Sequence, residues 1–203
     1  MDRFLLNSKE TEYKKQSLYD RIFIIAVILI LAFLFFLTQF WISISVVQMN
    51  SMANTLRPND KLITDRLATP NRGDIVVFEY SENVNYIKRV IAVENQTVYN
   101  DKYGNVYLEY LDKNGKLITE KLNEDYVKDG TSTYKNLCDF YIDHEKSLFR
   151  VEVKKGQLFV MGDNRLVSID SRDFGCISID QVSGVVHEFW VENKEFLTKI
   201  IKD

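Results

Sequence analysis

The two side chains best suited to act together chemically in this sequence are a serine and a lysine in separate short motifs. Ser51 opens the run Ser-Met-Ala-Asn-Thr-Leu, and Lys88 lies within the run Tyr-Ile-Lys-Arg-Val-Ile-Ala. A serine hydroxyl is a poor nucleophile until a base takes its proton. Because burial disfavours the charged form of a lysine, a lysine among apolar residues can be neutral and serve as that base. The pair therefore predicts nucleophilic catalysis.

The neighbours of Lys88 favour this interpretation. In strand alternation Lys88 shares one face with Tyr86 and Val90, whereas Arg89 lies on the other face and is expected to be a solvent-directed or paired cation. The ordinary alternative is a lysine whose stem crosses apolar surface and carries its charge to water.

Two further polar motifs follow a fixed order along the chain. Arg-Gly-Asp at 72–74 precedes the apolar run Ile-Val-Val-Phe, and Gly-Asp-Asn-Arg at 162–165 is followed by Ser168 and by Asp-Ser-Arg at 170–172. Each resembles a polar turn beside a buried strand, and an Asp–Arg pair is expected to hold the second one. Taken alone, each motif is equally consistent with an ordinary structural turn.

Other catalytic chemistries receive little support from the sequence. His144 and His187 stand in no recognisable triad context, and Cys138 and Cys176 form no CxxC pair. We therefore expect no metal site and interpret both cysteines as structural, with a disulfide between them left open. The net charge of −3 and the lack of a basic cluster argue against nucleic acid as a partner.

An uncharged apolar segment near the N-terminus predicts a membrane anchor. Residues 22–41, IFIIAVILILAFLFFLTQFW, are long enough to span a hydrocarbon core as a helix. Basic residues gather before this segment, which places residues 1–21 in the cytoplasm and the rest of the chain outside. The alternative is a cleavable signal peptide, for which Ser43-Ile44-Ser45 offers small residues at the right spacing.

The remaining sequence predicts antiparallel β-structure. Strands are expected at 44–47, 74–80, 85–93, 97–100, 106–111, 149–153, 158–161 and 182–190, with turn residues between them. Asn114-Gly115 suggests a type I′ hairpin. Residues 95–155 are richer in Asp, Lys, Asn and Tyr. They are interpreted as an inserted, non-catalytic subdomain within a catalytic core formed by residues 42–94 and 156–203.

With all four motifs in place, the chain resembles the type I signal peptidase family. That family has a serine followed by methionine, an RGD strand, a Y-I-K-R-V motif and a GDNR…S…DSR..G block, and this sequence has each of them. The resemblance covers about 46–93 and 154–186. It implies a mainly β fold with a catalytic core and a smaller inserted subdomain.

The resemblance also implies a role for individual residues. Ser51 would be the nucleophile, with its backbone N–H in the oxyanion hole, and Lys88 the general base. Ser168 would orient the lysine, and Asp170 and Arg172 would form a structural ion pair. The substrate pocket would be lined by Met52, Tyr86 and Ile87. No metal or cofactor is implied.

The implied function is removal of signal peptides from exported preproteins at a bacterial plasma membrane. The substrate would bind as an added β-strand and be cut after small residues at positions −1 and −3, in Ala-x-Ala fashion. The partners would therefore be preproteins and the lipid bilayer.

Three departures from the family pattern leave alternatives open. Asn54 replaces the usual proline and Met49 replaces a Gly or Ser that can supply an oxyanion donor, while Leu166 and Val167 replace residues that are commonly polar. One alternative is a non-catalytic or dedicated accessory protein for assembly of a surface structure such as a pilus. Another is a self-cleaving Ser/Lys repressor, but the anchor and the lack of a helix-turn-helix pattern disfavour it.

Overall fold

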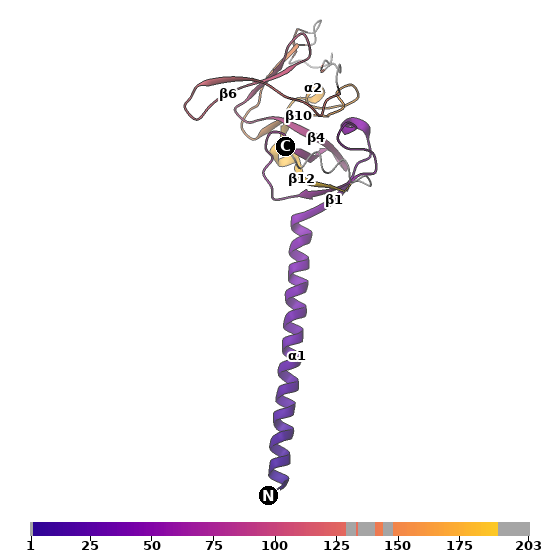
Figure 1. The fold of residues 1–203 in the computed structure, drawn as a ribbon, viewed down its shortest axis with the longest axis vertical. Helices are drawn as coiled ribbons and strands as arrows, with labels where there is room; N and C mark the ends of the chain where they lie inside the picture. The colour runs from indigo at the N-terminus through magenta and orange to yellow at the C-terminus, as the bar shows by residue number, and fades with distance from the viewer. Residues whose placement is uncertain (1, 129–132, 134–140, 144–147, 191–203) are drawn as a thin grey trace. The chain divides into compact units, whose positions relative to one another are not determined.

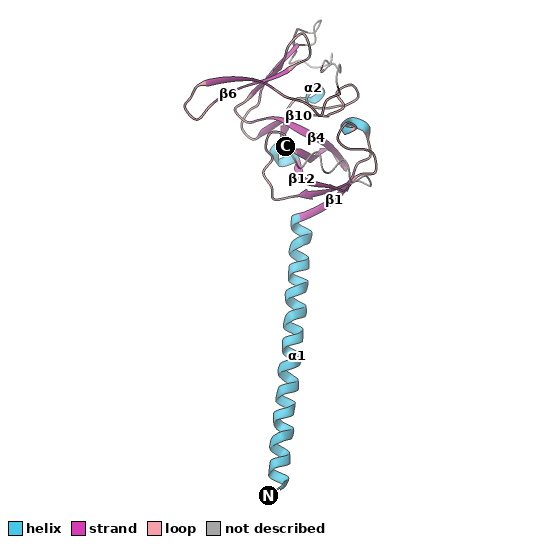
Figure 2. Ribbon diagram, in the orientation of Figure 1, coloured by secondary structure: helices cyan, strands magenta, loops and turns pink. Residues whose placement is uncertain are grey.

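The computed structural model describes residues 2–128, 133, 141–143 and 148–190 (Figure 1). The chain divides into two compact units at residue 41, an N-terminal helix and a C-terminal β-rich unit. Figure 2 shows that strands dominate the second unit and that its helices are short.

The first unit is one continuous helix, α1 (Asp2–Trp41), of 40 residues. Its most apolar stretch, Tyr19–Phe36, has a mean hydropathy of 2.4, and none of this stretch is buried within the protein. By length and composition this stretch can cross a membrane. The helix begins well before the predicted span, since it also includes the polar residues from Asp2 onward. It ends at Trp41, where the predicted span also ends.

The second unit contains a seven-stranded antiparallel sheet with the strand order β1-β2-β12-β3-β4-β10-β11. Its strands come from both ends of the β-rich unit and are β1 (Ile42–Val46), β2 (Lys61–Asp65), β3 (Ile75–Ser81), β4 (Val84–Val93), β10 (Gln157–Met161), β11 (Ile177–Ser178) and β12 (Val182–Trp190). The first four residues of β3 are all buried because apolar clusters cover both faces of this central strand.

A five-stranded antiparallel sheet with the order β7-β6-β5-β9-β8 is formed by the chain between β4 and β10. Its strands are β5 (Thr97–Asn100), β6 (Val106–Leu111), β7 (Leu117–Lys121), β8 (Tyr141–Asp143) and β9 (Leu148–Glu152). In β6 the buried Val106 and Leu108 alternate with more exposed residues, as expected of a strand with one face on a core.

The two sheets share one hydrophobic core. Ile91 on β4 and Phe159 on β10 pack in the same buried cluster as Val98, Leu108 and Phe149 of the five-stranded sheet. The rings of Phe149 and Phe159 stack with their centroids 5.6 Å apart. The inserted strands are therefore packed against the two strands that carry the Lys88 and Gly162 motifs.

Several short elements were not predicted from the sequence. These are β2, β7, β8, β11, the four-residue helix α2 (Ser171–Phe174), and the 3₁₀ turns η1 (Asn50–Met52) and η2 (Ile179–Gln181). The predicted type I′ turn is wrong. Of Asn114 and Gly115 only Gly115 has positive φ, and the loop closes between Asp112 and Lys116. That closure leaves three loop residues, for which a type I turn followed by a left-handed glycine is the common solution.

We predict that the shared core makes folding of the two sheets interdependent. Leu108→Ala removes a side chain that is 0% exposed, and it should lower the free energy of unfolding by about 2–5 kcal/mol. Leu111→Ala, on the same strand but 65% exposed, should cost less than about 0.5 kcal/mol. Denaturant unfolding of the full chain in detergent tests this. Equal losses for the two variants would contradict a shared core.

Candidate active site

The candidate nucleophile lies on a short turn held by buried apolar side chains. Met49 is extended, with φ −122° and ψ 168°, and the chain then turns through η1, which contains Ser51. Met52 is 1% exposed and Leu56 is 0% exposed, and both pack with Val77 of β3. Met52 and Leu56 thus fix the turn against the sheet, and the position of Ser51 follows from the packing of these two residues that come after it.

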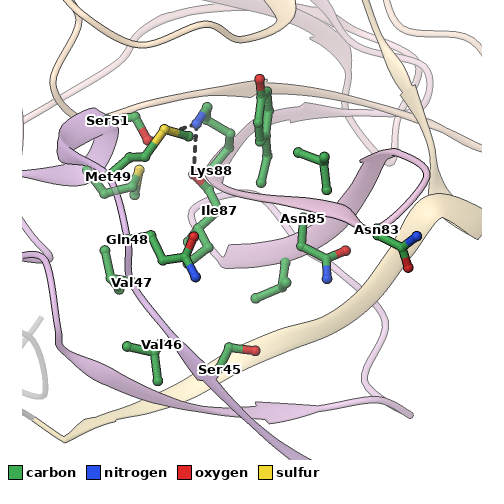
Figure 3. Close-up of a pocket in the computed structure, with 14 residues that line it drawn as sticks. Ser45, Val46, Val47, Gln48, Met49, Ser51, Asn83, Asn85, Ile87 and Lys88 are labelled. Carbon is green, nitrogen blue, oxygen red and sulfur yellow. Dashed lines mark hydrogen bonds between the residues drawn. The ribbon is translucent and has the colours of Figure 1, made fainter.

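Lys88 lies on β4 and its amine meets the Ser51 hydroxyl. The Lys88 Nζ and Ser51 Oγ atoms are 2.9 Å apart, and Nζ also donates to the Ile87 carbonyl at 3.0 Å (Figure 3). Lys88 is only 1% exposed, and Nζ lies 4.9 Å from the centre of the Tyr86 ring. The geometry permits direct proton transfer between the two groups.

The turn at 162–164 braces Ser51 from a third segment. The Asn164 N–H donates to the Ser51 carbonyl at 3.0 Å, and the Asn164 side-chain amide donates to the Asn50 carbonyl at the same distance. A Cβ added to Gly162 would lie 2.2 Å from Ser168 Oγ and 2.5 Å from the Ser51 carbonyl oxygen. Glycine is therefore required at 162 by close approach of the backbone.

Asp163 joins the turn that contains Ser51 to β4. Its buried carboxylate accepts hydrogen bonds from the Thr55 hydroxyl and from Nε and Nη2 of Arg89, the latter two at 2.9 and 2.7 Å. Arg89 is therefore a paired cation. Asn54 donates to the Asp163 carbonyl at 3.1 Å, so the residue that replaces the usual proline tethers the same turn.

Ser168 is fully buried beneath this turn. Its backbone N–H donates to the Asn164 carbonyl at 3.1 Å, and its hydroxyl lies against Gly162, close to the Ser51 backbone. A side-chain hydrogen bond with Ser168 is one of the interactions that lower the pKa of Asp170.

Asp170 and Arg172 form a fully buried ion pair. Two hydrogen bonds of 2.8 Å join the Arg172 guanidinium to the carboxylate, and neither side chain is exposed. Burial acts to raise the pKa of Asp170, but the bonds and charge of Arg172, with the Gly162 N–H and Ser168, hold it below its usual value. The carboxylate also caps helix α2, which fixes the end of the 162–172 block.

A cleft of about 490 Å³ runs to the serine–lysine pair. Residues 45–49 line one side and residues 83–88 of the β3–β4 hairpin line the other, as Figure 3 shows. Met52 and Val77 also line the cleft. The structure thus brings Ser51, Lys88 and the three predicted pocket residues Met52, Tyr86 and Ile87 to one place.

Some positions singled out in the sequence contribute differently. Met49 is 56% exposed and lines the cleft, and Leu166 and Val167 are also exposed. Cys176 is half-buried, and burial raises the pKa of its thiol to about 11. The side chain of His187 is not described, and Cys138 and His144 lie outside the described residues.

Sequence reasoning did not single out Asn164 or the tethering contact of Asn54. Asn164 belongs to a recognised motif, but its two bonds join segments more than 100 positions apart in the chain. The only signal for Asn54 was that a polar residue stands where the resembling family has proline.

Comparisons with known proteins identify the family of this chain. A family model described as "Signal peptidase, peptidase S26" matches residues 20–191. Signal peptidase I of Bacillus caldolyticus is 35% identical over 71% of this chain and 78% of its own length. Signal peptidase IB of Staphylococcus aureus is 32% identical over 87% of this chain and 91% of its own length. The structure of a signal peptidase I from Enterococcus faecalis is 26% identical, covers 59% of this chain and 98% of its own, and has a TM-score of 0.43.

The class defined by the fold and these comparisons is a mainly β serine endopeptidase with one apolar N-terminal helix. The chain belongs to the signal peptidase family, peptidase S26.

We predict that the Asp170–Arg172 pair is essential for stability. Asp170→Asn leaves the Arg172 guanidinium buried without a carboxylate and should lower the free energy of unfolding by about 3–5 kcal/mol at pH 7. Because the folded-state pKa of Asp170 is lowered, this stabilisation is present above the unfolded pKa of about 3.9 and is lost as pH falls below it.

Denaturant unfolding at pH 7 and pH 3 checks both parts of this prediction. The difference between wild type and Asp170→Asn should be smaller at pH 3. Asp180→Asn, an exposed aspartate on η2, serves as the matched control and should change stability by less than about 0.5 kcal/mol. If the difference in free energy of unfolding between wild type and Asp170→Asn grew toward low pH, the predicted direction of the pH dependence would be wrong.

Proposed function

We propose that this protein removes signal peptides from exported preproteins, using Ser51 as nucleophile and Lys88 as general base. The observation that carries the proposal is the 2.9 Å contact between Ser51 Oγ and the amine of a lysine that is 1% exposed. Membership of the signal peptidase family supports the substrate class.

In this mechanism burial keeps Lys88 neutral, so that the Ser51 O–H donates to the lone pair of Nζ. As Oγ attacks the scissile carbonyl, the proton passes to Nζ and a tetrahedral oxyanion forms. Collapse breaks the peptide bond, and the proton on Nζ is returned to the leaving amine. Water then attacks the ester on Ser51 while Lys88 takes one of its protons. The ester C–O bond breaks, the signal peptide leaves with a new C-terminal carboxyl group, and Nζ returns the proton to Oγ.

The protein must hold the serine, the lysine and the developing oxyanion in place during this reaction. We assign Ser168, buried beside the Ser51 backbone, to orientation of the Lys88 amine, and the Asp170–Arg172 pair to support of the 162–172 block. The Ser51 backbone N–H is assigned to the oxyanion hole. Met49 offers no side-chain N–H or O–H there, so any second donor must come from elsewhere.

The cleft suits a substrate bound as an added β-strand. Residues 45–49 and 83–88 face each other across it, and Met49 has an extended backbone. An extended peptide between them would pair with main-chain groups and direct alternate side chains inward. Met52, Tyr86 and Ile87 line the inner part of the cleft, which we assign to small residues at positions −1 and −3.

The proposed location is a bacterial plasma membrane, with α1 as a single-pass anchor in the bilayer. The five basic residues before residue 22, where the uncharged segment begins, favour a cytoplasmic N-terminus and an extracytoplasmic catalytic unit. We propose the seven-stranded sheet with the nucleophile turn as the catalytic core, residues 42–94 and 156–203. Residues 95–155, with the five-stranded sheet, form the non-catalytic subdomain.

A non-catalytic accessory role in assembly of a surface structure is the competing proposal, and Met49 is the observation that favours it. With Met49 in place of the usual serine, the oxyanion hole lacks one side-chain donor, as expected of a member that no longer catalyses the reaction. The contact between Ser51 and Lys88 supports the enzyme instead, because an accessory protein has no need of a buried lysine against a hydroxyl.

We predict that the serine and the lysine are each indispensable. Ser51→Ala and Lys88→Met should each lower preprotein cleavage by the full chain in detergent by at least about 10³-fold, because nucleophile or base is lost. Ser81→Ala and Lys121→Met, both exposed and not among the residues that line the cleft, are the controls and should keep wild-type rates. Near-normal cleavage by either dyad variant would exclude the mechanism, and an inactive wild type would favour the accessory role.

The pocket assignment predicts the cleavage rule. Replacing alanine at −1 or −3 of the preprotein with a leucine or a lysine should lower kcat/KM by about 10²-fold or more, because we assign the part of the cleft lined by Met52 and Ile87 to small side chains. The same changes at −2, where the side chain points away from the floor, should have less than about a tenfold effect. Product mapping by mass spectrometry locates the cut, and equal sensitivity at all three positions would contradict the strand model.

A further inference from the structure

The inserted subdomain reaches the dyad through a buried cluster of charges around Arg89, the residue that follows Lys88. Arg89 gives three of its N–H groups to fixed acceptors, two to the Asp163 carboxylate and one to the Gly73 carbonyl at 2.8 Å. Its side chain is 14% exposed, and that of Asp163 is 0% exposed. The pair thus locks β4 to the turn that braces Ser51.

Asp163 transmits this lock to the nucleophile. Its carboxylate accepts from Thr55, its carbonyl from Asn54, and its N–H meets Met52 Sδ at 3.4 Å. All three partners belong to residues 52–55, which directly follow Ser51. A shift of Asp163 would therefore move the serine with respect to Lys88.

The Arg89–Asp163 pair is covered by a segment of the inserted subdomain that follows β7. The Tyr126 ring lies over the Arg89 guanidinium with 4.1 Å between ring centre and Cζ, and Arg165 lies 5.9 Å from the same ring. The Tyr126 hydroxyl donates to Glu124 at 3.1 Å, and Glu124 forms an ion pair with the fully buried Arg165. Burial raises the pKa of Tyr126 well above its usual value, so its hydroxyl stays a neutral donor.

Arg165 completes the connection back to the site. Its Nε donates to the Gly162 carbonyl at 3.0 Å. Glu124 is therefore linked to the Gly162–Arg165 turn through Arg165, and Tyr126 is linked to the same turn through Arg89 and its partner Asp163. An aromatic ring over an ion pair excludes water and strengthens the attraction between the charges.

We propose that Tyr126, supplied by the otherwise non-catalytic subdomain, is a positioning residue that sets the Ser51–Lys88 geometry through Arg89 and Asp163. This inference rests on the proposed function, since it assigns Tyr126 to the same reaction. Tyr126 contacts neither the dyad nor the cleft, so it acts on the proton-transfer distance and leaves substrate binding unchanged.

The test uses the full chain in detergent with a preprotein substrate and compares Tyr126→Ala with Tyr126→Phe. Loss of the ring should lower kcat by about 10–100-fold with KM within about threefold, because small misplacement of reacting groups is costly. Phenylalanine keeps the ring over Arg89 and should restore kcat to within about threefold of wild type. Tyr103→Ala, a 75% exposed tyrosine of the same subdomain, is the matched control and should be unchanged.

A second readout does not depend on cleavage. Reductive methylation followed by peptide mapping measures access to the Lys88 amine, which should rise at least about fivefold in Tyr126→Ala and stay at the wild-type level in Tyr126→Phe and Tyr103→Ala. If Tyr126→Ala fails to fold, Tyr126→Leu, which keeps apolar cover without the aromatic face, is read in the same way.

The results separate the two proposals. An inactive wild type overturns the proposed function, whereas the labelling of Lys88 still decides the role of Tyr126. Unchanged kcat and unchanged labelling in Tyr126→Ala, or a loss confined to KM, overturns the positioning role. A loss in Tyr126→Phe as large as in Tyr126→Ala overturns the role of the ring.

Discussion

A lysine amine withdrawn from water and held against a serine hydroxyl is the constraint on which the rest of this structure depends. The charged form of a lysine is strongly hydrated, so burial of Lys88 at 1% exposure must be imposed by the surrounding fold. Strand β4 provides that burial because apolar clusters cover the sheet around it. The serine then has to be brought to the amine, since the amine on a rigid strand cannot move far to meet it.

Three chain segments meet to satisfy this constraint, and each is anchored differently. The turn that contains Ser51 is anchored by Met52 and Leu56 in an apolar core. The strand carrying Lys88 is anchored by its ladder with β3 and β10. The 162–172 block is anchored by buried ions, because its glycine and aspartates offer little apolar surface of their own. Ionic anchoring is directional, which suits a segment that must present Asn164 to the backbone of Ser51.

Much of this arrangement was already determined by the sequence. The apolar segment, the alternating strands and the order of the four motifs led to a mainly β fold behind an N-terminal helix, and the family resemblance is confirmed by the family model and by the curated relatives. Strand alternation and turn residues are local signals, and so they can be read without coordinates. The short strand β2 escaped because it is defined by distant pairing partners, Ser43 and Val186. The helix α2 escaped because its four residues are too few to show a helical period.

Only the tertiary structure decided which residues meet. It placed Lys88 at 2.9 Å from Ser51, turned Arg89 into the partner of Asp163, and gave Asn54 a tethering contact. It also brought Tyr126 of the inserted subdomain over Arg89. Residue types and their spacing indicate which chemical groups the chain can offer. Distances between segments far apart in sequence follow from how the sheets pack, and no local pattern encodes them.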